Sequence, residues 1–337
     1  MTDALPAWIE YRPRPFPDAN FLLLHGARPA LVDSGFVAHA HETHAWVSER
    51  VGGADLVVNT HWHADHVGGN GLFQQRGSGI AAAAPDHDAI NRRDPGCCVA
   101  EYLDQPVAPY TVDIPLRDGD RMDLGEATWE IIATPGHTAG HLALWQPEAG
   151  VLVVGDAVST YDVGWVALAL DGTDATATAM ASLERMADLP ATTVLPAHGP
   201  APTDVAAFFA KAHTRASRLV DDPDGAVWYG ARRILAYALM IRDGIPTDAI
   251  EEYLLARAWV RDAARLLRRD AEGFVDELVR GMVDAGAVVL DGGRLKAAAD
   301  HTLVDPYPQV PWPRSWPDAP ATTPEPPESQ TTPEETP

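Results

Sequence analysis

The chain has 337 residues, 46% of them hydrophobic, and its 25 basic and 48 acidic side chains give a formal charge of −23. This length exceeds what one compact core of about 150 residues requires, so we expect at least two folded units. The acidity argues for solubility and against broad affinity for nucleic acid or anionic membranes, although a local basic patch is still possible.

The chain shows no positively charged, apolar leader over residues 1–16 and no uninterrupted apolar run near the roughly 20 residues that span a bilayer. Cys97 and Cys98 are the only cysteines, and adjacent cysteines form an intrachain disulfide only under strain. We therefore expect a cytoplasmic protein that does not associate with a membrane.

A first unit is expected over residues 8–220, where short apolar runs alternate with segments of helical periodicity. Strands interrupted by helices indicate a layered α/β architecture. The strands are predicted at 20–24, 30–33, 56–60, 129–133, 141–145, 151–155 and 192–196, and the helices at 37–51, 85–93, 173–188 and 203–220.

A second unit is expected over residues 226–300, after a turn-rich break at 221–225. Helices are predicted at 227–241, 247–255, 256–269 and 272–285, followed by two short strands around the Asp-Gly-Gly turn within 287–296. The remainder, 305–337, is rich in proline, threonine and glutamate, so we expect it to be largely disordered. Its stretch 307–316 carries two tryptophans that could dock on the body.

Potential metal ligands gather in the segment Thr60-His-Trp-His-Ala-Asp-His-Val-Gly-Gly69, directly after a predicted strand. Imidazole and carboxylate together suit zinc and related divalent ions, whereas magnesium and calcium prefer oxygen ligands alone. A tight loop can direct two of these side chains to one ion and two to a neighbouring ion. The candidate ligands are His61, His63, Asp65 and His66, joined downstream by His137 in Thr-Pro-Gly-His, Asp156 in Gly-Asp-Ala and His198 in Pro-Ala-His-Gly-Pro.

These motifs resemble the metallo-β-lactamase superfamily over roughly residues 8 to 215. The resemblance implies a four-layer αββα sandwich with two divalent metals, zinc before iron or manganese, at the rim between its sheets. It assigns His61, His63 and His137 to the first metal, Asp65, His66 and His198 to the second, and Asp156 to both. It also places Asp33 and His141 next to the ligands, as their supports.

Two adjacent cations lower the pKa of a shared water to about 7 and so provide a hydroxide that can attack a carbonyl or phosphoryl centre. Asp65 and Asp156 are the residues expected to orient this hydroxide and move its proton. Tyr161, on the loop after Asp156, is the best candidate for a substrate contact, with Ser159, Thr160 and Trp165 beside it.

The leading hypothesis is a metal-dependent hydrolase of a small ester, thioester or lactone, similar in its metal motifs to glyoxalase II. The helices and hairpin of residues 226–300 resemble a winged-helix module, which some hydrolases of this superfamily carry at this end, where it covers the active-site rim or mediates self-association. A nuclease or phosphodiesterase is a second hypothesis, because an arginine series could form one helical face. A mononuclear iron sulfur dioxygenase is a third, because such enzymes share much of the motif. The arginines are Arg257, Arg261, Arg265 and Arg268 or Arg269.

Overall fold

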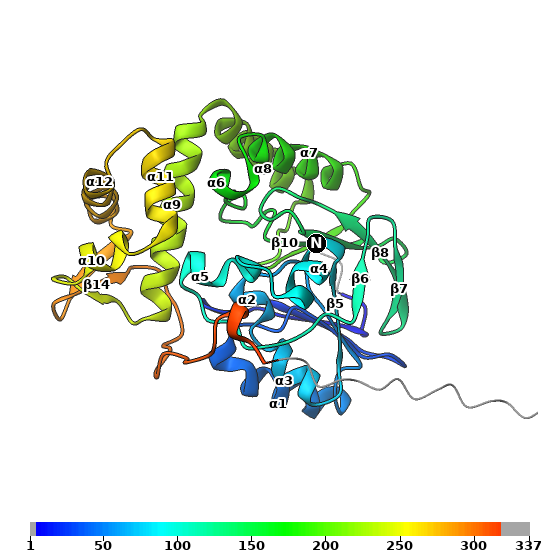
Figure 1. Cartoon of the computed structure of the whole chain (residues 1–337). Coiled ribbons are helices and arrows are strands. Elements are labelled where there is room, and N and C mark those ends of the chain that lie inside the picture. The colour runs from blue at the N-terminus through cyan, green and yellow to red at the C-terminus, as the bar shows by residue number, and fades with distance from the viewer. Residues whose placement is uncertain (1–4, 318–337) are drawn as a thin grey trace, which may run out of the picture.

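The computed structural model describes residues 5–317 and contains two β-sheets that face each other (Figure 1). The first sheet has the order β1-β2-β3-β4-β5-β6, and the second has the order β11-β10-β9-β8-β7. The first sheet comprises β1 (Ile9–Arg12), β2 (Phe21–Leu24), β3 (Ala30–Val32), β4 (Leu56–Val58), β5 (Gly79–Ala83) and β6 (Ile114–Leu116). The second comprises β7 (Arg121–Leu124), β8 (Ala127–Ala133), β9 (Leu142–Gln146), β10 (Val151–Gly155) and β11 (Thr193–Pro196).

Side chains alternate between the two faces of each sheet, because successive residues of a strand point to opposite sides. In β2, Leu22 and Leu24 belong to the core between the sheets, where they join Trp129 of β8. Phe21 and Leu23 belong instead to the core under the outer helices. Every residue of β2 is therefore buried, and the strand reads as a continuous apolar run.

Helices cover the outer face of each sheet and complete the predicted αββα order. The first sheet is covered by α1 (Ala40–Val51), α3 (Asn70–Gln75) and α4 (Ala84–Arg92), and the second by α7 (Ala175–Ala187) and α8 (Val205–Asp221). Short helices α2 (Ala64–Val67), α5 (Ala100–Leu103) and α6 (Leu168–Asp171) lie in connections, as do the 3-10 turns η1 (Val37–His39) and η2 (Cys97–Val99). The seven predicted strands are present, whereas β1, β5, β6 and β7 were not predicted.

Residues 223–297, which we call the C-terminal module, contain four helices and a small three-stranded sheet of order β12-β14-β13. Their core includes Leu235, Trp259 and Phe274. The predicted break at 221–225 is confirmed but is limited to Asp222, which separates α8 from α9. Pro223 already occupies the first turn of α9, and the Asp222 carboxylate accepts a hydrogen bond from the Gly225 amide. The elements are α9 (Pro223–Ile241), β12 (Ile245–Pro246), α10 (Ile250–Leu255), α11 (Ala258–Leu266), α12 (Ala271–Asp284), β13 (Val288–Asp291) and β14 (Arg294–Ala297).

The segment 305–317 is ordered on the body, which corrects the prediction that disorder begins at 305. Trp316 is 5% exposed, belongs to the core beneath the first sheet's helices and packs on Tyr110 at a ring distance of 5.6 Å. Tyr307 receives a hydrogen bond from Arg242, which directly follows α9. The segment also contains η3 (Pro313–Ser315), and the docking predicted for its two tryptophans is confirmed. The rest of the predicted disordered tail, 318–337, lies outside the described residues.

Between residues 5 and 317, no helix is both long enough and apolar enough to cross a membrane. The cytoplasmic location stays a prediction.

Candidate metal centre

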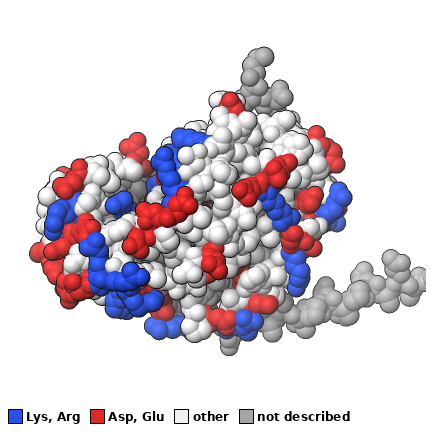
Figure 2. Space-filling view, turned by 90° about the horizontal axis from the view of Figure 1, so that it is seen from above, with Lys and Arg blue, Asp and Glu red and all other residues white. Residues whose placement is uncertain are grey.

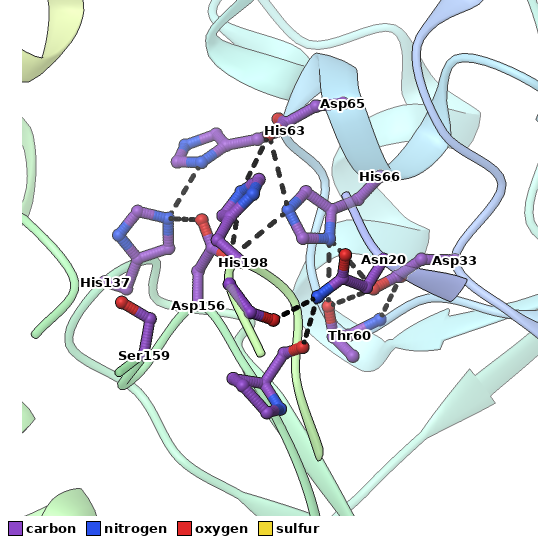
Figure 3. Close-up of polar contacts among 12 residues, drawn as sticks. Asn20, Asp33, Thr60, His63, Asp65, His66, His137, Asp156, Ser159 and His198 are labelled. Atoms are coloured by element: carbon purple, nitrogen blue, oxygen red, sulfur yellow. Dashed lines mark hydrogen bonds and ion pairs between the residues drawn. The ribbon is translucent and has the colours of Figure 1, made fainter. Parts of the chain in front are cut away.

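The seven predicted ligands lie together at one rim of the sandwich, where strands of both sheets end. Figure 3 labels all of them except His61. His61 follows β4, and α2 carries Asp65 and His66. From the second sheet, Asp156 follows β10 directly and His198 follows β11 after one residue. His63 and His137 complete the cluster, the latter from the β8–β9 connection. The fold thus joins residues that are separated by up to 137 positions in the chain.

Three imidazoles form a first group, with one ring nitrogen from each directed to a common point. The Nδ1 atom of His63 lies 3.1 Å from Nε2 of His61 and 2.9 Å from Nε2 of His137. All three side chains are buried. Three converging imidazole nitrogens form one face of a tetrahedral zinc site.

Two carboxylates and two imidazoles form a second group beside the first. Nε2 of His198 lies 3.2 Å from an oxygen of Asp65 and 3.4 Å from Oδ1 of Asp156. The second oxygen of Asp156, Oδ2, lies 3.6 Å from Nε2 of His137 in the first group. The Asp156 carboxylate therefore stands between the two groups, with one oxygen toward each.

The hydrogen bonds around these rings fix which nitrogens carry lone pairs. Nδ1–H of His137 donates to the carbonyl of Trp165 at 2.7 Å, and Nδ1–H of His66 donates to Asp33 at 2.8 Å. The opposite nitrogen of each ring then presents a lone pair to the cluster. Nε2 of His66 and Oδ1 of Asp156 are buried and have no hydrogen-bond partner among the described residues. Since a buried polar atom without a partner is costly, these residues fit a pair of bound cations.

The electrostatic environment differs between the two groups. Burial lowers the pKa of His61 and of His63 well below the usual value, which leaves neutral imidazoles, the form that binds metals. Burial also opposes charge on His198, yet the carboxylates of Asp156 and Asp65 raise its pKa to about 9. The second group therefore favours positive charge between its side chains.

Two further polar residues support the ligands from behind, as expected. The Asp33 carboxylate accepts from the Thr60 amide and hydroxyl as well as from His66. His141 lies outside both groups: its Nδ1–H donates to the Thr134 hydroxyl, and its Nε2 accepts from the Asp156 amide at 3.1 Å. His141 thus fixes the backbone position from which Asp156 reaches both groups.

Aromatic rings flank the cluster on two sides. Trp165 stacks on His63, and Phe16 stacks on His198 with ring centroids 4.6 Å apart. Trp165 was predicted beside Tyr161 among the residues near the substrate, whereas Phe16 and the hydrogen-bonding role of Asn20 were not predicted. The Asn20 amide donates to the carbonyls of Pro196 and Gly199, which flank His198. Neither residue lies in a recognisable local motif, because each contacts the His198 loop, which is nearly 180 positions away in the chain.

A cavity of about 660 Å³ opens in front of the cluster, and it is lined by His63, Asp65, His137, Asp156 and His198. Its size is typical of small-molecule sites, about 300–1,000 Å³. Tyr161 lines the cavity and is 57% exposed. Ser159 also lines the cavity, but its hydroxyl is engaged in its own loop, where it accepts from the amides of Tyr161 and Asp162.

An αββα sandwich with two adjacent His/Asp groups at the rim between its sheets defines a class of metal-binding proteins. A model described as the metallo-beta-lactamase superfamily matches residues 14–198. The chain belongs to this superfamily, whose members typically bind divalent metals.

Several relatives share part of the sequence. A beta-lactamase-like protein 2 homolog from Caenorhabditis elegans is 29% identical over 217 residues, which are 59% of this chain and 63% of that protein. A hydroxyacylglutathione hydrolase from Rhodobacter capsulatus is 38% identical over 109 residues, which are 32% of this chain and 35% of that enzyme. The matches therefore cover less than two thirds of either relative.

Solved structures show the same fold. A metallo-beta-lactamase family protein from Thermus thermophilus aligns with a TM-score of 0.55 and 23% identity over 87% of this chain and 100% of its own. A subclass B3 metallo-beta-lactamase of Bradyrhizobium japonicum gives 0.53 and 19% over 66% of this chain and 95% of its own. At these identities the likeness concerns the fold alone.

Proposed function

We propose that the protein is a two-metal hydrolase that cleaves a small ester, thioester or lactone. The observation that carries the proposal is the Asp156 carboxylate, which turns one oxygen to the three-histidine group and the other to the Asp65, His66 and His198 group. A carboxylate shared between two ligand groups holds two ions close together.

The residues present would hold one ion with His61, His63 and His137, and a second with Asp65, His66 and His198. Asp156 would contribute to both. Zinc is the ion that best suits this set of imidazoles and carboxylates, and iron or manganese are alternatives. When bound, such a pair supplies Lewis acidity and water of lowered pKa at neutral pH.

The chain's own side chains then position the reactants. Asp65 and Asp156 both line the cavity, so either carboxylate can accept a proton from the attacking water. The Tyr161 hydroxyl is the proposed hydrogen-bond donor to a substrate oxygen. Phe16 and Trp165 form apolar walls next to the cluster and keep bulk water away from the reacting groups.

The thioester part of the proposal draws support from the hydroxyacylglutathione hydrolases among the relatives. The match covers 35% of the Rhodobacter capsulatus enzyme and 59% of the Brucella ovis enzyme. The chemistry proposed to be shared with these relatives is therefore the hydrolysis of small acyl compounds. Which acyl and thiol groups the protein accepts depends on the cavity of this chain.

We further propose that the C-terminal module is winged-helix-like and serves the active site, with nucleic acid as the less favoured partner. Supporting this, β14 lies between β12 and β13, after three consecutive helices. The arginine series is largely paired within the protein, since Arg257 meets Asp104, Arg265 meets Asp262 and Arg269 meets Glu277. Figure 2 shows basic and acidic side chains side by side on this part of the surface.

Metal analysis and a substrate panel test the proposal together. We expect about two zinc ions per chain and turnover of at least one thioester, ester or lactone, with turnover lost in His61→Ala. His213→Ala is the matched control, because His213 is half-exposed on α8 and lies outside both ligand groups. Both variants should remain folded by circular dichroism.

Three results would point elsewhere. One iron per chain with oxygen-dependent oxidation of a thiol would identify a sulfur dioxygenase. Cleavage of RNA or a phosphodiester in preference to acyl compounds would identify a nuclease or phosphodiesterase. Full turnover in His61→Ala would show that the cluster does not take part in the reaction.

A further inference from the structure

The cavity in front of the metal centre is closed on its far side by helix α9 of the C-terminal module. Ile234, Tyr237 and Met240 of α9 line it, and the aromatic rings of Phe16 and Trp165 line the side next to the ligands. These wall residues lie three positions apart along α9, so they share one face of the helix. The acyl or leaving group of a substrate at the metals would therefore contact α9.

The polar groups on this wall are already used within the protein. The Tyr229 hydroxyl donates to the Val163 carbonyl at 2.5 Å, and the Tyr237 hydroxyl donates to the Pro17 carbonyl at 2.9 Å. These bonds tie α9 to the loop that carries Trp165 and to the segment that carries Phe16. The tyrosines consequently contribute their rings, more than their hydroxyls, to the cavity.

Among the described residues that line the cavity outside the ligand groups, the single basic side chain, Arg233, is already paired with a carboxylate. Among the described lining residues outside the ligand groups, the acidic and basic side chains are those of Asp162, Arg233 and Asp300. Arg233 is paired with Asp162 at 2.8 Å, and Arg215 lies 3.6 Å from the same carboxylate. The remaining carboxylate, Asp300, would repel an anion.

These features bear on which substrate charges the cavity can accommodate. Glutathione carries two carboxylates and one ammonium group, and a thioester of glutathione would have to bring them toward this wall. A charged group that loses water without gaining a partner is strongly disfavoured. An alkyl or aryl group, in contrast, gains by leaving water for the rings and aliphatic side chains of the wall.

We infer that α9 selects substrates whose distal group is uncharged and apolar, and that it rejects esters of charged thiols such as glutathione. The inference rests on the proposed function and names the substrate class of the same site. Specificity in this protein accordingly resides on the C-terminal module, whereas the ligands come from the sandwich.

A binding experiment tests this selection separately from turnover. The probes are two uncleavable thioethers that share a hexyl group, S-hexyl-N-acetylcysteamine and S-hexylglutathione, titrated calorimetrically into the zinc-loaded full chain. We expect the uncharged thioether to bind at least about 10-fold more tightly. Equal or tighter binding of S-hexylglutathione would overturn the inference.

A matched pair of variants locates the selection on α9. Ala236 lines the cavity and is half-buried, so Ala236→Arg adds a cation to the wall and Ala236→Met adds similar bulk without charge. We expect Ala236→Arg to reduce the preference for the uncharged thioether at least about 5-fold, while Ala236→Met retains it. An unchanged preference in Ala236→Arg would show that α9 does not select the ligand.

The same protein, assayed with hexanoyl thioesters of the two thiols, distinguishes the two proposals. A tenfold binding preference without hydrolysis of any acyl compound would refute the proposed hydrolase and support the apolar selection. Hydrolysis of the glutathione thioester as fast as, or faster than, the N-acetylcysteamine thioester would support the hydrolase and refute the selection.

Discussion

The indole ring of Trp165 lies parallel to the imidazole ring of His63, with an interplanar angle of 4° and ring centroids 5.5 Å apart. The same residue accepts a hydrogen bond from His137 through its backbone carbonyl. Trp165 therefore contacts two of the three histidines in the first group, one through its side chain and one through its backbone.

Truncation of the Trp165 side chain is predicted to weaken metal binding by the three-histidine group. In Trp165→Ala the His63 ring loses its stacking partner, and we expect the affinity for the first zinc ion to fall about 10-fold, the lower end of effects seen for groups that support metal ligands. Trp165→Phe keeps an aromatic face and should retain most of the affinity. Competition with a chromophoric chelator measures both, and wild-type affinity in Trp165→Ala would contradict the positioning role.

Neutralisation of Asp33 is predicted to weaken the second group selectively. Asp33 adopts a left-handed backbone conformation, with φ of 59°, which asparagine also tolerates. In Asp33→Asn the His66 ring loses its charged partner, so we expect the affinity for the second ion to fall about 10- to 100-fold. At a low, buffered concentration of free zinc, the number of zinc ions bound per chain should drop from about two toward one. Two tightly bound ions in the variant would show that Asp33 does not support the binding of the second ion.

Burial of Asp86 predicts a pH-dependent stability that does not involve the metals. Burial raises the pKa of Asp86 to about 8, and one carboxyl oxygen has no hydrogen-bond partner among the described residues. The other oxygen is packed so closely on Gly140 that a Cβ there would lie 2.0 Å away. The folded state holds this proton more tightly than the unfolded state does. The contribution of Asp86 to the unfolding free energy is therefore greatest below about pH 4 and falls as the pH rises to about 8.

The Asp86→Asn variant isolates this effect, because asparagine has nearly the same shape and does not titrate. We expect its unfolding free energy to be less dependent on pH between about 5 and 8, and to exceed that of the wild type by roughly 3–5 kcal/mol at pH 8. Urea unfolding at several pH values measures the difference. Parallel pH profiles for the two proteins would show that Asp86 is ionised in the fold.

Docking of the segment 305–317 predicts a stability cost when its anchor is removed. Trp316 is 95% buried relative to an extended chain and contacts Tyr110, and its indole N–H donates to the Pro311 carbonyl at 2.9 Å. We expect Trp316→Ala to lower the unfolding free energy by about 2–4 kcal/mol. The exposed Leu303 provides a control, since Leu303→Ala should change stability by less than about 1 kcal/mol. Equal effects would mean that the segment does not dock in solution.

Local sequence signals located much of the fold but missed particular strands. β5 consists of Gly-Ile-Ala-Ala-Ala, and alanine has the highest helix propensity, so its composition does not indicate a strand. It is a strand because β4 and β6 pair with it on either side in parallel register. The same reasoning applies to β7, whose Arg-Met-Asp-Leu sequence becomes a strand through its pairing with β8.

The sequence by itself determined which residues could bind metals, because four ligands within six positions at the end of an apolar strand have few other uses. It also predicted the helices and the final hairpin of the C-terminal module, whose periodicity and glycine turn are local properties. Only the tertiary structure showed that Asp156 stands between two ligand groups, that Phe16 stacks on His198 and that α9 closes the cavity. Several of those contacts join segments far apart in the chain, such as Phe16 and His198, and no local periodicity encodes them, since they arise when layers of the sandwich and the module pack together.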